Sequence, residues 1–272
     1  MTLQELCNIE PWEWPEGTAD FILETLSSPA TDPEDRLLAA EMAGDYVVAN
    51  DKLAGALLAL VNNAAESPAL RSQAAISLGP ALEHADIFGF DDPDDIVISE
   101  KVFTQIKSSL QSTFQDKNNP TEVRRSILEA SVRAPQSWHQ AAVKNAYQSK
   151  EEEWRLTAVF CMSYIDGFKT EILESLLSAN PDIHYQAVLA AANHGMEKAW
   201  PHIKSLLTSA TVEKPLIFAA IEAAVIIGSP EAKETLEDLL EDDDDEIADA
   251  VHEALAMLEA EDLLEDEEDD EE

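Results

Sequence analysis

Residues 32–44 read DPEDRLLAAEMAG, and residues 67–79 read SPALRSQAAISLG. Both stretches begin with a short polar residue followed by Pro, place an Arg at the fifth position and end with Gly. A short polar side chain before Pro is typical of a helix start, because it accepts orphan backbone amides at a point where Pro has none to lose. A pattern that returns after about 35 residues predicts stacked helical repeats rather than a globular enzyme fold.

The pattern recurs to the end of the chain with changes. Five further copies begin close to residues 119, 151, 180, 214 and 245. The Arg of the first four copies stands at Arg36, Arg71, Arg124 and Arg155, and the fifth copy has His184 instead. Successive Arg residues are 35, 53 and 31 positions apart, so one interval is too long. We therefore expect an insertion between the second and third copies, at residues 83–99.

A second apolar stretch follows the copies. These stretches are residues 52–61, 102–114, 138–147, 170–177, 200–207 and 232–240. Their apolar residues recur at i, i+3 and i+4, as in Leu236, Leu239 and Leu240, which is one face of a helix and not the alternation of a strand. The sequence therefore predicts an all-α fold, a right-handed superhelical solenoid of about six to seven helix pairs.

The solenoid is expected to span residues 32–258, with a different kind of segment at each end. Residues 1–31 are expected to form an N-terminal cap over the first repeat, because an array exposes an apolar face at its end. Residues 259–272 are almost entirely acidic. Such a composition cannot bury enough apolar surface to fold alone, so it predicts a disordered acidic tail.

The first helices resemble those of HEAT-repeat proteins, whose pattern is D-x-x-V-R-x-x-A-x-x-A-L-G. The best matches are Glu122-Val123-Arg124, and Arg71 followed by Ala74 and Leu78-Gly79. The likeness is to the small bacterial members described as phycobilisome-lyase-like HEAT repeats. It implies the solenoid architecture and says little about activity, because the repeat serves many tasks.

The net charge of −39 is distributed unevenly. Residues 1–100 carry 20 acidic and 3 basic side chains, residues 101–230 carry 13 of each, and residues 231–272 carry 23 acidic and 1 basic. The acidic end has two interpretations: a solvating cap on the last repeat, or an attraction for a basic partner that weakens with salt. Direct binding to nucleic acid is disfavoured, because no basic stripe is present.

The remaining composition predicts a cytoplasmic protein that does not enter the membrane. Cys7 and Cys161 are too few for a disulfide framework, which indicates a reducing compartment. The first 15 residues lack the basic region of a secretory signal. The longest apolar run, residues 216–227, contains Glu222 and is shorter than the roughly 20 residues of a membrane helix.

The repeated Arg residues are expected to form a structural ladder. They lie one turn into each first helix and come into register when repeats stack, where they can bridge to acids of neighbouring repeats. An anion-binding groove is the alternative. The change to His184, and the loss of the Arg at Ala248 in the last copy, make a continuous groove less favoured.

No cofactor, metal or catalytic residue is predicted. The deoxyhypusine hydroxylases, HEAT proteins with a di-iron centre, resemble this chain in repeat type and need about four His-Glu pairs, whereas only His252-Glu253 has that form. The acidic runs 91–95 and 242–246 lack the ligand spacing of a calcium loop. Cys161 lies in an apolar stretch, where a thiol behaves as a small hydrophobe.

We therefore expect a non-catalytic scaffold that binds a protein partner, a basic one in particular. The alternatives are an acidic decoy or chaperone that mimics nucleic acid toward a basic protein, and a bilin-lyase-like enzyme, which the family likeness alone suggests. Large aromatic side chains are typical binding anchors, although at helical positions they also serve as core. The candidate partner-binding residues are Trp12, Trp14, Phe88, Phe90, Trp138 and Trp200.

Overall fold

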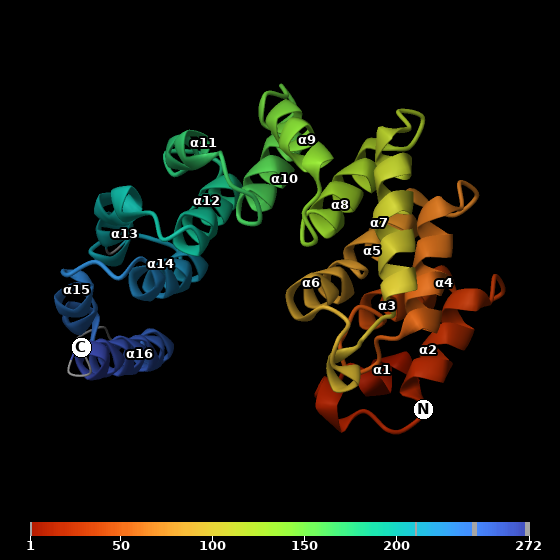
Figure 1. Cartoon of the computed structure of the whole chain (residues 1–272), viewed down its shortest axis with the longest axis horizontal. Coiled ribbons are helices and arrows are strands. Elements are labelled where there is room, and N and C mark those ends of the chain that lie inside the picture. The colour runs from red at the N-terminus through yellow and green to blue at the C-terminus, as the bar shows by residue number, and fades with distance from the viewer. Residues whose placement is uncertain (1, 210, 241–243, 270–272) are drawn as a thin grey trace. The chain divides into compact units, whose positions relative to one another are not determined.

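The computed structural model describes residues 2–209, 211–240 and 244–269, with side chains up to residue 260. Within those residues every regular element is a helix, and the fold is an α-solenoid, as predicted (Figure 1). The chain divides into two compact units, residues 1–142 and 143–272. None of the helices described is both long enough and apolar enough to cross a bilayer.

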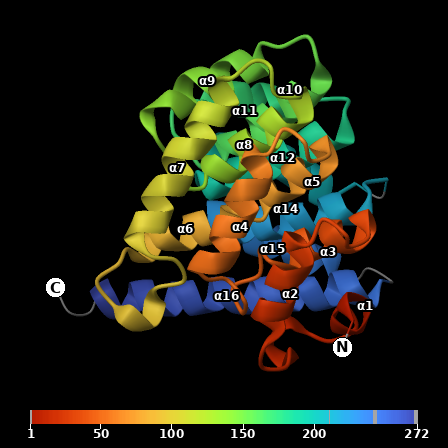
Figure 2. The same ribbon diagram turned by 90° about the vertical axis from the view of Figure 1, so that its right-hand side faces the viewer.

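The first unit contains two layers of helices and one additional helix. Its elements are α1 (Leu3–Leu6), η1 (Pro11–Glu13), α2 (Thr18–Ser27), α3 (Pro33–Met42), α4 (Asp51–Asn62), α5 (Pro68–Ile76), α6 (Gly79–Phe88), η2 (Pro93–Asp95), α7 (Glu100–Gln115), α8 (Thr121–Ser131) and the start of α9 (Ser137–Tyr147). One layer runs α3, α5, α8 and the other α2, α4, α7, with α4 beside α7 in both views (Figure 1, Figure 2). Their apolar faces meet in a continuous core.

The second unit repeats this arrangement. Its elements are α10 (Glu152–Met162), α11 (Lys169–Ser175), α12 (Pro181–Asn193), η3 (Glu197–Ala199), α13 (Trp200–Leu207), α14 (Lys214–Ile227), α15 (Ala232–Leu239) and α16 (Asp245–Asp269). Helices α10, α12, α14 and α16 pack in sequence, while α11, α13 and α15 cover them. The six apolar stretches expected to be second helices correspond to α4, α7, α9, α11, α13 and α15.

Polar residues before Pro cap three of the first helices, α3, α5 and α12, in the expected way. Asp32 accepts the amide of Glu34 at 2.9 Å, and Ser67 accepts the amide of Leu70 at 3.2 Å. Asn119 differs, because α8 starts one residue later with Pro120 as its N-cap. Each capping bond satisfies an amide that has no partner within its helix.

The glycines that close the first two patterns do not stop helices by adopting a left-handed conformation. Helix α3 ends at Met42, and a Cβ placed on Gly44 would lie 3.0 Å from the Ser77 Cα. Gly79 begins α6, and its Cβ would lie 2.9 Å from the Arg133 Cδ. Backbone of another element approaches Gly44 closely, which favours Gly there, whereas the atom close to Gly79 belongs to a flexible side chain. Gly228, with φ 60°, is a left-handed helix end.

Two segments differ from the sequence expectation. The insertion expected at residues 83–99 contains only the second part of a helix, α6, which begins earlier, at Gly79. Where a disordered tail is expected from residue 259, α16 continues as a helix to Asp269, and residues 270–272 lie outside the part described. Ala, Leu and Glu, which fill this end of the chain, are strong helix formers, whereas overall composition measures only the capacity to build a core.

Candidate functional site

The repeated Arg residues of the first unit bond to the helix that precedes them. The Nε atom of each donates to a carbonyl ten residues earlier, in the last turn of α2, α4 or α7. These carbonyls have no partner within their own helix, so the Arg side chains act as caps. The pairs are Arg36 with Leu26 at 3.3 Å, Arg71 with Val61 at 2.9 Å and Arg124 with Phe114 at 2.9 Å.

The same guanidinium groups reach toward the next repeat. Both Nη atoms of Arg36 donate to the Glu66 carboxylate at 2.8 Å, and Arg71 donates to the Asn119 side-chain oxygen at 2.6 Å. Arg36 and Arg71 are buried. Their donors are therefore used within the protein, which favours a structural role over an anion-binding groove. In the second unit, the Arg155 guanidinium lies 6.0 Å from the centre of the Tyr147 ring.

The aromatic candidates do not form one surface. Trp12 and Phe88 are 74% and 56% exposed. Trp14 donates its indole N–H to the Leu6 carbonyl at 3.1 Å, and the Phe90 ring lies 5.5 Å from that of Phe103. Trp138 is half-buried, 5.0 Å from the ring of Phe114.

Trp200 requires a correction. Trp200, the first residue of α13, is only 8% exposed. A buried indole offers almost no surface to a partner. The spacing of apolar residues along a sequence does not tell which of their side chains are buried. The sequence therefore did not distinguish the buried Trp200 from the exposed Trp12.

Sequence reasoning missed His139, the fully buried histidine of the first unit. Its Nδ1 accepts the Gln136 amide at 2.9 Å, so its Nε2 carries the proton and donates to the Ser131 hydroxyl at 3.0 Å. A general base would instead accept from the serine. Burial lowers the pKa of His139 to about 4, and this pair is a neutral structural contact.

The remaining histidines do not assemble a metal centre. His184 and His202 place their Nε2 atoms 2.7 Å apart, which is a hydrogen bond between neutral imidazoles. Burial lowers the pKa of both rings, and for His184 the neighbouring His202 adds to this effect. Over the residues whose side chains are described, no group of three or more His, Cys, Asp or Glu side chains is placed to hold a metal ion.

An apolar groove lies between α14 and α16 in the second unit. The sequence KPLIFAAIEAAVII makes α14 apolar almost all round, so it covers α12 and α13 and still presents apolar side chains toward α16. Opposite them, α16 presents the small residues Ala250 and Ala254, which leave space between the helices. The groove has a volume of about 460 Å³.

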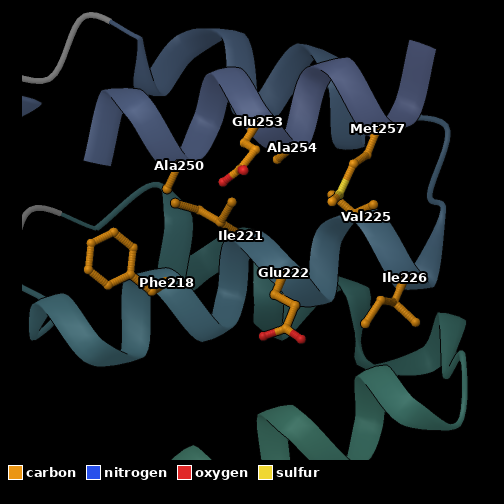
Figure 3. A pocket seen from close by; sticks show the side chains of 9 residues that line it. All are labelled: Phe218, Ile221, Glu222, Val225, Ile226, Ala250, Glu253, Ala254 and Met257. Carbon is orange, nitrogen blue, oxygen red and sulfur yellow. The ribbon is translucent and has the colours of Figure 1, made fainter. Parts of the chain in front are cut away.

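Figure 3 shows the walls of this groove, which we call the α14/α16 groove. Its lining residues are Phe218, Ile221, Glu222, Val225, Ile226, Ala250, Glu253, Ala254 and Met257. Met257 extends toward Val225, and the Glu253 carboxylate lies between the two helices. Ile226 and Met257 remain 45% and 56% exposed.

The electrostatic character of the groove is negative. Its charged lining residues are Glu222 and Glu253, both exposed, and no basic side chain lines it. Lys214 begins α14, but its ammonium group pairs with Asp244 at 2.8 Å and Glu246 at 2.5 Å. The site can hold apolar side chains while its rim attracts a cation.

The comparison with protein families agrees with this architecture in the second unit. Residues 170–256 match HEAT repeats. The match confirms the HEAT-like pattern over that range, which includes most of both groove walls. The finer likeness to phycobilisome-lyase-like proteins stays a prediction. No curated protein matches the chain.

Several solved structures are similar to the chain at low identity. The Escherichia coli protein YibA is 18% identical, with a TM-score of 0.47, over 90% of this chain and 84% of that one. Human deoxyhypusine hydroxylase in complex with glycerol is 16% identical, with a TM-score of 0.40, over 90% and 97%. A designed armadillo repeat protein in complex with the peptide (KR)4 is 16% identical, with a TM-score of 0.34, over 88% and 98%.

Proposed function

We propose that this chain is a non-catalytic scaffold that binds a basic, amphipathic segment of a protein partner in the α14/α16 groove. The observation that carries the proposal is the combination of an open apolar groove with an acidic rim. Repeat solenoids of this kind use continuous surfaces rather than enclosed pockets for binding.

The apolar part of the argument rests on exposure. Ile226 of α14 and Met257 of α16 both line the groove, and covering them would remove apolar surface from water at about 25 cal/mol per Å². Monomeric proteins seldom leave contiguous apolar surface uncovered unless it has a binding role. A partner side chain such as Leu or Met is therefore the expected anchor.

The charge of the partner follows from the surroundings of the groove. Glu222 and Glu253 lie in it, and residues 231–272 carry 23 acidic side chains against one basic. A Lys or Arg next to the apolar anchor would pair with this rim, and salt would weaken the attraction by screening. An acidic partner, or a nucleic acid, would be repelled.

Selection from a random peptide library displayed on phage tests the proposal with the full chain as target. We expect enriched peptides to carry a large apolar residue flanked by Lys or Arg. Ala250→Phe fills the groove, so it should weaken the affinity of those peptides at least tenfold, as measured by fluorescence polarisation. The matched control is Ala256→Phe, which adds the same ring at an exposed position of α16 outside the groove lining.

The rim is tested separately. Glu222→Gln together with Glu253→Gln should weaken binding severalfold and reduce its salt dependence, because two interacting charges are removed. Enrichment of acidic peptides, or an affinity unaffected by Ala250→Phe, would refute the proposal.

A further inference from the structure

Helix α6, the additional helix of the first unit, carries two rings of a partly exposed row of three. The His84 ring lies 4.5 Å from that of Phe88, one turn later on α6, and 5.7 Å from that of Tyr46, in the loop between α3 and α4. We call Tyr46, His84 and Phe88 the aromatic row. Tyr46 and Phe88 are 51% and 56% exposed, and their sequence neighbours Val47 and Ile87 are 53% and 68% exposed.

The position of α6 explains why the row is uncovered. Each regular first helix is covered by its own second helix, whereas α6 is inserted between α5 and α7 and packs one side on α7 and α8. Ala81, Leu82 and Ala85 form its buried side. Glu83 pairs with Arg133, which fixes α6 to the segment after α8. The fold therefore holds the row in place without using its outer surface.

The surroundings of the row are acidic. Asp86 lies on the same helix, 3.7 Å from the Lys107 ammonium group. Phe88 ends α6, and the following turn carries exposed Asp91, Asp92, Asp94 and Asp95. Burial, and then the Glu83 carboxylate, raise the pKa of Tyr46, while the nearby Arg133 guanidinium opposes this shift; the ring remains a neutral phenol at physiological pH.

Aromatic faces beside carboxylates are the chemistry that recognises a guanidinium group. Arg is planar and weakly hydrated, so it stacks on aromatic rings while donating to acids, whereas the ammonium group of Lys is a more strongly hydrated point charge. The chain already uses this contact internally, with the Arg124 guanidinium 5.2 Å from the centre of the Phe114 ring.

We infer that the aromatic row of α6 is a docking surface for an arginine-bearing segment of a protein partner. The Arg side chain would stack on Tyr46 and Phe88, and the acids at the end of α6 would attract it. This site lies in the first unit and does not depend on the α14/α16 groove, so either can fail without the other.

Two fluorescein-labelled peptides of equal charge test the inference, one of alternating Arg and Ala and one of alternating Lys and Ala. With the full chain we expect the Arg peptide to bind about fivefold more tightly, since a cation–π contact contributes roughly 1 kcal/mol. Phe88→Leu keeps the apolar character and removes the ring, so it should abolish this preference. Trp12→Leu removes a ring that is 74% exposed and lies outside the row, and it should leave the preference unchanged.

Photo-crosslinking locates the contact. An Arg peptide bearing a benzophenone group should attach to residues 44–49 and 83–95. Equal binding of the two peptides, an Arg preference that survives Phe88→Leu, or crosslinks confined to residues 214–269 would each overturn the inference. Crosslinks confined to residues 214–269 would still be compatible with the α14/α16 groove as a site for a basic segment. Ala250→Phe, which changes only the groove, should leave the Arg preference intact.

Discussion

His139 shows how one buried side chain links the stability of the fold to pH. Its pKa is about 4 in the folded protein, against an ordinary value of 6.5. Between pH 6.5 and 4, His139 is therefore mostly protonated in the unfolded chain and mostly neutral in the folded chain. The contribution of His139 to the free energy of unfolding is complete above about pH 7. It falls as the pH drops from 6.5 toward 4, and about 2 kcal/mol of it is lost at pH 5. Urea unfolding followed by circular dichroism at pH 7.5 and pH 5 measures this loss.

The matched variant for this residue is His139→Gln. It removes the titrating ring, so the difference in free energy of unfolding between the two pH values should shrink by about 2 kcal/mol. The comparison between proteins is needed because protonation of carboxylates changes the self-repulsion of a chain with net charge −39. Identical pH slopes in the two proteins would contradict the assignment.

At the scale of the helix, the sequence predicted what local physics determines. Polar residues before Pro located α3, α5 and α12, because capping is a short-range interaction. The spacing of Arg71 and Arg124 indicated an insertion but did not show that α6 begins at Gly79, because the distance between two residues does not tell where a helix between them starts. The α14/α16 groove depends on small residues of one helix facing large ones of another, which no single segment encodes.

The junction of α3 and α5 gives a test at this scale. Gly44→Ala should destabilise the protein by about 1–3 kcal/mol, because the new methyl group would lie 3.0 Å from backbone of Ser77. Gly55→Ala is the control within the same unit: Gly55 is in the interior of α4, and nothing lies within 4 Å of its Cβ position. That change should stabilise by about 0.5–1 kcal/mol. Urea unfolding measures both changes. If close approach is not the reason for Gly44, Gly44→Ala and Gly55→Ala will change the free energy of unfolding in the same direction.

At the scale of the whole molecule, the charge distribution opposes the compact state. Both terminal regions are strongly acidic, so their self-repulsion should be relieved when NaCl is raised from 10 to 100 mM and the screening length falls from about 30 to about 10 Å. We expect the thermal midpoint to rise over this range by several degrees. Glu237→Gln with Asp238→Asn removes two exposed acids from the last turns of α15, where the helix dipole also disfavours them. This variant should melt higher at 10 mM NaCl and gain less from added salt. A midpoint that falls with salt would mean that attractive surface pairs, such as Lys204 with Glu231, outweigh the repulsion.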